Sequence, residues 1–62
     1  MPKYDVGDIL QVEASYRPNG CWYVMVTELK DNRYYYFYLD DGRPDWSAID
    51  GLDGSEGISR YA

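Results

Sequence analysis

The sequence predicts an all-β fold, a small barrel of about five short antiparallel strands. Short apolar runs are interrupted by turn-forming residues about every ten positions, which is the pattern of a small barrel or sandwich. No segment has apolar residues at helical spacing over a useful length. Eight Tyr, two Trp and one Phe among 62 residues supply the large side chains that so short a chain needs for a core. We expect one domain that spans residues 1–62.

The first strands are predicted from alternation and turn signals. The segment 9–14 alternates apolar and polar side chains, so one of its faces points inward. Pro18-Asn19-Gly20 favours a hairpin turn, because Asn-Gly tolerates positive φ angles. The segment 21–29 is apolar on both faces, and Lys30-Asp31-Asn32 ends it with a second turn.

The third strand, 33–39, carries aromatic side chains on both faces, and Asp40-Asp41-Gly42 follows it as a turn. The segment 45–52 is short and mixed, with a single 3₁₀ turn expected at residues 47–50. Residues 58–61 are expected to form a last short strand. We expect one of the two tryptophans, Trp22 or Trp46, to pack against the core. The expected core residues are Leu10, Val12, Val24, Val26, Phe37 and Ile49.

The charge pattern limits the function. The formal net charge is −5, and six carboxylates but one base, Arg43, lie between Asp40 and Glu56. Such a surface repels nucleic-acid phosphates and attracts a basic peptide or protein face. We therefore expect a protein or peptide partner, which is basic, no direct binding of nucleic acid, and no membrane. Alternatively, the acidic residues have no binding role and only keep an aromatic-rich chain soluble.

Residues for chemistry are scarce. Cys21 is the one cysteine and there is no histidine, so an internal disulfide is impossible and a zinc site within one chain is nearly excluded. Asp40 and Asp41 are adjacent and point apart if the strand continues, which indicates a solvated turn and not a catalytic pair. We expect a cytoplasmic protein without catalytic residues, metal or cofactor.

Several short motifs resemble those of Tudor domains. They are Val6-Gly7-Asp8, the strand end at Ala14-Ser15-Tyr16, the turn and aromatic pair at Asn19-Gly20-Cys21-Trp22-Tyr23, and Tyr38-Leu39-Asp40-Asp41-Gly42. The resemblance implies a cage in which aromatic rings hold a methylated lysine or arginine beside a carboxylate. Carried over residue by residue, it implies a ligand-binding patch formed by Tyr16, Tyr23, Tyr38 and Asp41. Arg43 departs from the family pattern and would repel a cation beside that cage.

The C-terminal segment, from Gly54 to Tyr61, instead resembles the tail of peptide-binding SH3 domains. Both resemblances imply the same SH3-like barrel, but a barrel alone does not identify a function. We expect a non-catalytic module that recognises a basic or methylated peptide, or a basic protein surface, through an aromatic patch rimmed by acid.

Three alternatives to that module stay open. The tyrosines can be core packing that needs no ligand. The chain can be a small acidic inhibitor, of phage or mobile-element type, that caps a basic or nucleic-acid-binding site on a partner. It can also be a subunit of an enzyme assembled around a symmetric pore. The doubly aromatic third strand further predicts a homodimer that covers its outer face.

Overall fold

The chain folds into one antiparallel sheet with a short helix above it. The computed structural model describes residues 2–62, and within them five strands lie in the order β4-β3-β2-β1-β5. The all-β class and the five antiparallel strands are therefore confirmed. The elements in chain order are β1 (Ile9–Glu13), β2 (Cys21–Lys30), β3 (Arg33–Tyr38), β4 (Pro44–Ala48), the helix α1 (Ile49–Asp53) and β5 (Ile58–Arg60).

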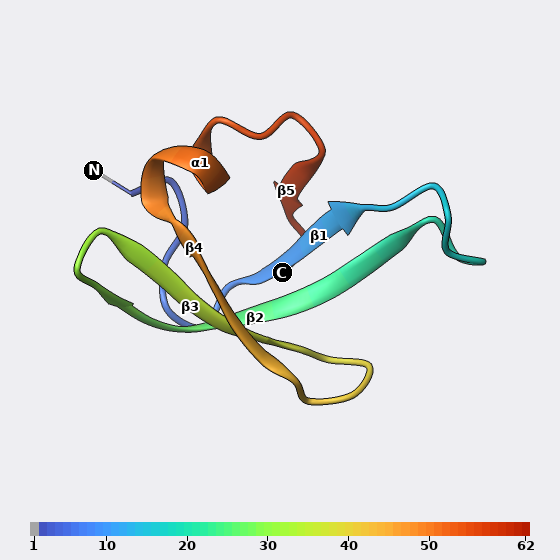
Figure 1. Cartoon of the computed structure of the whole chain (residues 1–62), viewed down its shortest axis with the longest axis horizontal. Coiled ribbons are helices and arrows are strands. Elements are labelled where there is room, and N and C mark those ends of the chain that lie inside the picture. Colours follow the sequence, from blue (N-terminus) through green and yellow to red (C-terminus); the bar gives the residue numbers. More distant parts are fainter. Residues whose placement is uncertain (1) are drawn as a thin grey trace.

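The sheet is curved but not closed. Figure 1 shows α1 and the segment that leads to β5 on one side, over the curved sheet that β1 to β4 form. In the described part of the chain β4 and β5 are the two edges of the sheet, so the expected closure of the barrel is wrong. The chain passes from β4 into α1 and a turn before β5 begins, and these residues occupy the space between the two edges.

The free edge of β4 offers few hydrogen-bond donors. Tyr38 donates its backbone N–H to Arg43 at 2.9 Å, and the register that follows points the backbone groups of Pro44 and Trp46 away from β3. Pro44 has no N–H, and the N–H of Trp46 donates to the Asp45 carboxylate at 2.8 Å. Both features discourage another strand from pairing here.

The β2–β3 connection is a two-residue turn. Asp31 and Asn32 both have positive φ angles, 54° and 59°, as a type I′ hairpin requires. A bulge shifts the register between Val26 and Glu28, so that Leu29 stands opposite Tyr34. The predicted turn at residues 30–32 is confirmed.

The helix is an α-helical turn, and the 3₁₀ turn expected at residues 47–50 is wrong. Residues 44–48 continue as the strand β4, because they pair with β3 as far as Ala48, and the helix begins only at Ile49. Leu52 is its buried residue and packs into the core cluster.

The core lies on the concave side of the sheet. Val24 stands opposite Tyr38 and Val26 opposite Tyr36, so the even-numbered tyrosines of β3 share the inward face with the valines of β2. The predicted core residues Leu10, Val24 and Val26 are buried, and Val12 and Ile49 pack against them half-buried. Among the described residues, the buried cluster consists of Tyr4, Leu10, Val24, Val26, Tyr34, Tyr36 and Leu52.

The prediction for Phe37 is wrong. Phe37 stands opposite Met25 and Pro44, which places it on the outer face, where it is half-buried. Trp46 is also on the outer face, 48% exposed, and of the two tryptophans only Trp22 lies on the concave side. Either face of a doubly aromatic strand can form the core, and the pairing with β2 decides between them.

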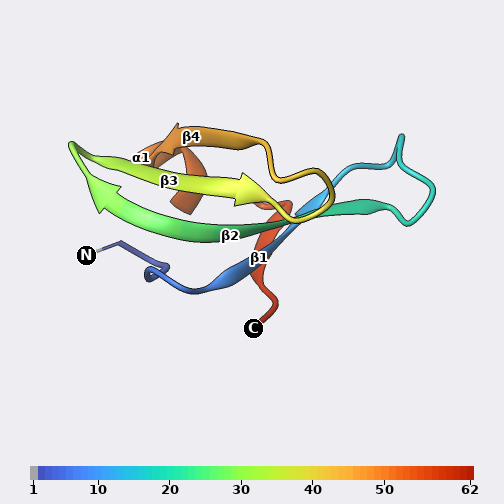
Figure 2. The same ribbon diagram turned by 90° about the horizontal axis from the view of Figure 1, so that it is seen from below.

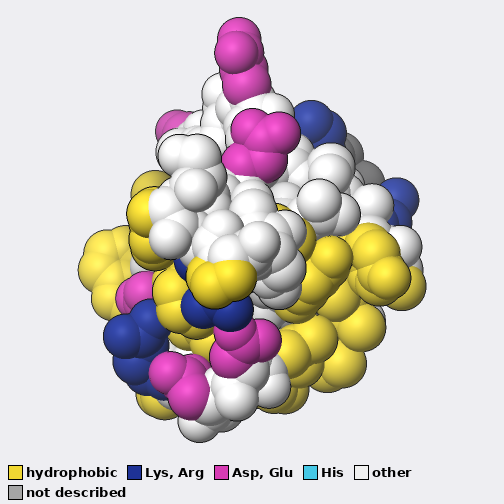
Figure 3. All heavy atoms as spheres, turned by 90° about the vertical axis from the view of Figure 1, so that its right-hand side faces the viewer, with side chains coloured by type: hydrophobic (Ala, Val, Ile, Leu, Met, Phe, Trp, Pro, Cys, Tyr) yellow, Lys and Arg dark blue, Asp and Glu magenta, His cyan; other side chains and the backbone are white. Residues whose placement is uncertain are grey.

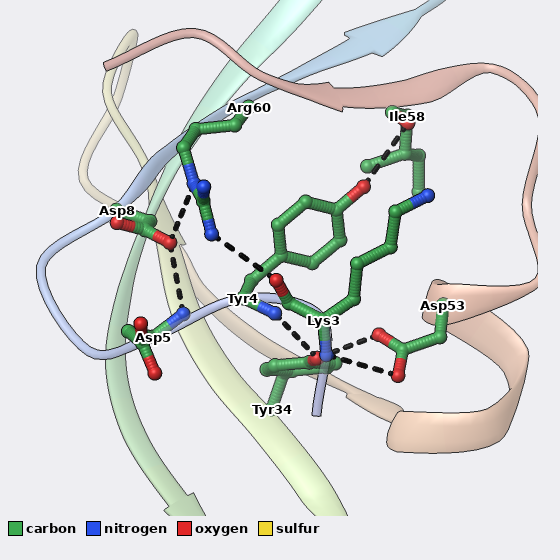
Figure 4. Close-up of polar contacts among 8 residues, drawn as sticks. All are labelled: Lys3, Tyr4, Asp5, Asp8, Tyr34, Asp53, Ile58 and Arg60. Atoms are coloured by element: carbon green, nitrogen blue, oxygen red, sulfur yellow. Dashed lines mark hydrogen bonds and ion pairs between the residues drawn. The ribbon is translucent and has the colours of Figure 1, made fainter. Parts of the chain in front are cut away.

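The N-terminal segment seals one half of the concave side. Tyr4 is 2% exposed and Tyr34 is fully buried, with their ring centroids 5.9 Å apart. The Tyr34 hydroxyl accepts the Tyr4 backbone N–H at 3.1 Å and donates to Asp53 of α1 at 2.6 Å. Burial, and next the bond to Asp53, raises the pKa of Tyr34. The Tyr4 hydroxyl reaches over to donate to the carbonyl of Ile58, as Figure 4 shows.

Polar contacts fasten the same segment from outside. Arg60 of β5 donates to the Asp8 carboxylate at 3.0 Å and to the Lys3 carbonyl at 3.1 Å (Figure 4). The Asp5 backbone N–H, and next Arg60, hold the pKa of Asp8 below its usual value. Residues 3–8 therefore form a strap, which we call the N-terminal strap, that joins β3, α1 and β5 over one end of the sheet.

Candidate ligand-binding cleft

The other half of the concave side contains a cavity of about 390 Å³. It lies between the inner face of the sheet on one side and α1 with the segment before β5 on the other. Its volume falls within the range of ligand pockets, roughly 300–1,000 Å³. The lining is largely apolar and consists of Val12, Val24, Tyr36, Tyr38, Ser47, Ala48, Gly51, Leu52, Ser55 and Ile58.

Two hydroxyl groups supply much of the polar chemistry of the lining. The Tyr36 hydroxyl and Ser47 Oγ form a hydrogen bond of 2.7 Å, in which either oxygen can donate. Each keeps hydrogen-bonding capacity for a further partner. The cavity wall is thus uncharged and largely apolar, and its polar groups are this hydroxyl pair and the hydroxyls of Tyr38 and Ser55.

Aromatic rings stand beside the cavity. Tyr38 meets Tyr36 at 5.9 Å and Trp22 at 5.2 Å between ring centroids, both edge to face. Trp22 Nε1 donates to the hydroxyl of Tyr16 at 2.7 Å, although Tyr16 itself is 79% exposed. Burial, and next the neighbouring Tyr36 and Asp45, raises the pKa of Tyr38. The Tyr38 hydroxyl is 3.5 Å from the Asp45 carboxylate.

Two arginines of the chain cover these rings. The Arg17 guanidinium lies over Trp22 with its Cζ 3.5 Å from the ring centroid, and it also forms an ion pair with Asp40. Arg43 lies over Tyr38 with its Cζ 4.7 Å from the centroid. Both are cation–π contacts of the usual geometry. Trp22 and Tyr38 therefore each already contact a cation of the same chain.

The structure brings together only part of the predicted patch. Tyr38 lines the cavity, and Tyr16 is joined to it through Trp22. Tyr23 stands opposite Gln11 on the outer face, where its ring meets Tyr61 at 4.9 Å. The expected convergence of three rings on one concave patch is therefore wrong, because Trp22 and Tyr23 are consecutive in β2 and point to opposite faces.

Asp41 has a local structural contact. Its carboxylate accepts the backbone N–H of Arg43 at 2.9 Å, within the turn between β3 and β4. It is not among the residues that line the cavity. A ligand contact by any of the four predicted residues stays a prediction.

Sequence reasoning missed Trp22, Tyr36 and Ser47 as residues of the site. Because alternate residues of a strand share a face, Trp22 lies on the same face of β2 as Val24 and Val26, which is the cavity side. The same parity along β3 groups Tyr36 with Tyr38. Ser47 had no sequence signal, since its position depends on the pairing of β4 with β3.

The outer face is also rich in apolar side chains. Ile9, Met25, Phe37 and Pro44 stand in one row across β1 to β4, and Figure 2 views the molecule from the side on which α1 lies behind this sheet. In Figure 3, which faces the end with the 14–20 and 39–43 turns, hydrophobic side chains form a broad area at the lower right. Charged side chains of both signs gather at the lower left, and others stand at the top and upper right. Self-association through the outer face stays a prediction.

Among residues 2–62, no three His, Cys, Asp or Glu side chains are grouped closely enough to hold a metal ion. The short helix α1 cannot cross a membrane, and no other helix long and apolar enough to do so occurs in that part of the chain.

Comparison with protein-family models, with curated proteins and with solved structures finds no match to this chain.

Proposed function

We propose that this chain is a non-catalytic binding module that recognises a basic segment of another protein through the cavity on its concave side. The observation that carries the proposal is the cavity itself. A domain of this size needs its large side chains for the core, and close packing leaves few voids in a protein interior. An open cavity walled by Tyr36 and Tyr38 is the usual form of a binding site.

The charges around the cavity support a basic ligand. Asp45 contacts the Tyr38 hydroxyl, and the exposed Asp50 and Glu56 are chain neighbours of the lining residues Gly51 and Ser55. Carboxylates in this arrangement raise the association rate of a cationic partner. The net charge of −5 acts in the same direction.

The proposal includes the finer assignment suggested by the sequence motifs. It is a Tudor-like or SH3-like module, and a small curved sheet of five antiparallel strands is consistent with that assignment. Its proposed place of action is the cytoplasm. Tudor-like modules hold methylated cations, so a methylated peptide belongs among the ligands to be tested.

Titration of the isotope-labelled chain with short lysine-rich peptides tests the function. We expect amide shifts at Tyr36, Ser47 and Gly51. Asp45→Asn should weaken binding of the peptide. Arg43→Ala should tighten it, because the substitution removes from beside Tyr38 a positive charge that repels the basic peptide. Glu28→Gln is the matched control, because Glu28 pairs with Lys30 at the β2–β3 turn, away from the cavity lining. Shifts confined to outer-face residues such as Tyr35 and Trp46 would contradict the proposal.

A second candidate is an acidic inhibitor that caps a basic site on a partner. The carboxylates from Asp40 to Glu56 favour it, since all of them except Asp53 are exposed. Capping by charge alone weakens steeply with salt, whereas a side chain held in the cavity keeps part of its affinity. The affinity for the partner at low and high salt therefore separates the two candidates.

A further inference from the structure

The aromatic rings beside the cavity are poor places for a foreign cation. The Arg17 guanidinium covers the face of Trp22 and is fixed there by its ion pair with Asp40. The Arg43 guanidinium lies over Tyr38, with its Cζ 4.7 Å from the ring centroid. A ligand cation would have to displace one of these guanidiniums and overcome repulsion from the other.

The cavity interior is suited to an uncharged group. Its walls include Val12, Val24, Leu52 and Ile58. Its polar side chains are uncharged hydroxyls, among them the hydrogen-bonded pair of Tyr36 and Ser47. A charge moved into apolar surroundings without a partner loses far more hydration energy than a hydrocarbon or an indole does. The interior thus favours a large apolar side chain, and one that carries a single hydrogen-bonding group fits best.

The surroundings of the cavity have the opposite preference. Asp45, Asp50 and Glu56 are exposed, and each lies beside a lining residue in contact or in sequence. They attract positive charge that stays in water. The neutral interior and the acidic rim therefore suit different parts of one ligand.

We propose that the cavity binds a large uncharged side chain, aromatic or branched aliphatic, from a peptide segment whose neighbouring residues are basic. This inference rests on the proposed function and specifies its ligand class. The apolar side chain is the anchor, and the basic residues contact the rim. Arg17 and Arg43 act as specificity-determining residues, because they occupy the ring faces that a methylated cation would use.

Calorimetric titration with a set of short peptides tests the inference. All share the same lysine residues and differ at one central position, which is Trp, Leu, Ala or trimethyl-lysine. Indole alone serves as a neutral probe of the cavity. We expect the Trp and Leu peptides to bind about tenfold or more tightly than the Ala peptide, and the trimethyl-lysine peptide to show no such gain.

Variants of the cavity wall make the test specific. Gly51 lies in α1 and no atom stands within 4 Å of the Cβ that a side chain would add there. Gly51→Leu adds bulk at a lining residue, and it should reduce the advantage of the Trp peptide to less than about threefold. Gly51→Ala is the matched control, which should retain most of that advantage, and thermal unfolding verifies that each variant folds.

The outcomes separate this inference from the proposed function. Equal binding of the Ala and Trp peptides, unchanged in Gly51→Leu, would overturn the apolar anchor and leave a module for basic segments. A clear preference for trimethyl-lysine would overturn the anchor as well. Indole binding at the cavity residues without binding of any peptide would sustain the uncharged site and refute the proposed function. Absence of all binding would refute both.

Discussion

The two halves of the concave side are lined by similar residues, but the chain fills only one of them. At the sealed half, Tyr34 is covered by Tyr4 of the N-terminal strap, and both belong to one buried cluster with Val26. At the open half, Tyr36 and Val24 face the cavity. Each half presents a tyrosine of β3 and a valine of β2, so the contrast depends on what lies above them.

The hydroxyl groups of Tyr34 and Tyr36 show the same contrast. The Tyr34 hydroxyl has partners within the chain on both sides, the Tyr4 N–H and the Asp53 carboxylate. The Tyr36 hydroxyl contacts Ser47 and retains capacity toward the cavity. A buried polar group whose bonds are complete stabilises the fold, whereas one with capacity to spare can contribute to binding. The sealed half therefore serves stability, and the open half is available for a ligand.

The largest effect should come from Val→Ala substitutions, which remove the same two methyl groups in the sealed half and at the cavity wall. Val26→Ala in the sealed half should lower the free energy of unfolding by about 2 kcal/mol or more, because it leaves a new void. Val12→Ala, at the cavity wall, should lower it by about 1 kcal/mol, since a void already exists there. Urea unfolding measures both, and a larger loss for Val12→Ala would invert the comparison.

The two tyrosine hydroxyls should differ in the same sense. Tyr34→Phe leaves the Tyr4 N–H and the Asp53 carboxylate without this partner and should cost about 1–3 kcal/mol of stability. Tyr36→Phe loses the bond to Ser47 and should cost about 0.5–1.5 kcal/mol. Chemical unfolding at neutral pH compares them, and equal losses would show that the strap does not depend on Tyr34.

Alkaline pH tests the same bond. Because the pKa of Tyr34 is raised in the folded chain, the folded state keeps a proton that the unfolded state releases. This contribution to stability is complete below the unfolded pKa of about 10 and is lost as the pH rises through the folded pKa. Between about pH 9 and pH 11, wild type should therefore lose more stability than Tyr34→Phe does. Parallel curves for the two proteins would count against the bond.

The smallest effect concerns the roof of the open half. Gly51→Ala should raise the unfolding free energy by about 0.5–1 kcal/mol, because glycine in a helix interior has excess freedom in the unfolded chain. No atom within 4 Å opposes the added Cβ. A fall in the melting temperature would show that the cavity side of α1 is more crowded than the structure indicates.

Local patterns were sufficient for the strands and turns. The alternation in residues 9–14 and the β-rich 33–39 segment each led to elements close to those observed. The Asn-Gly signal marked a hairpin, but its loop extends over residues 14–20 and of the pair only Gly20 has a positive φ angle. They were insufficient for the choice of face in β3, since Tyr36 and Phe37 are equally compatible with a core. Tyr4 escaped prediction because a residue before the first strand has no periodicity to reveal its burial.

The site was less predictable, because it depends on long-range pairing. Tyr38 was identified from a motif, but its neighbours Trp22 and Tyr36 follow from the register of β2 with β3. Ser47 and Gly51 reach the cavity only through the path of β4 and α1. The contact of Arg43 with Tyr38 agrees with the sequence-based concern about a cation at that position.

The β4 edge limits the ways in which a partner can be recognised. Because Pro44 lacks an N–H and Asp45 engages the N–H of Trp46, a bound segment gains little from backbone pairing along this edge. Backbone pairing is indifferent to residue type, so its suppression places the burden of recognition on side chains. A partner would then tolerate changes along most of its length and be intolerant at one or two positions. At the β4 edge the same feature also disfavours the strand stacking of fibre-like assemblies, which is a hazard for a chain with eight tyrosines.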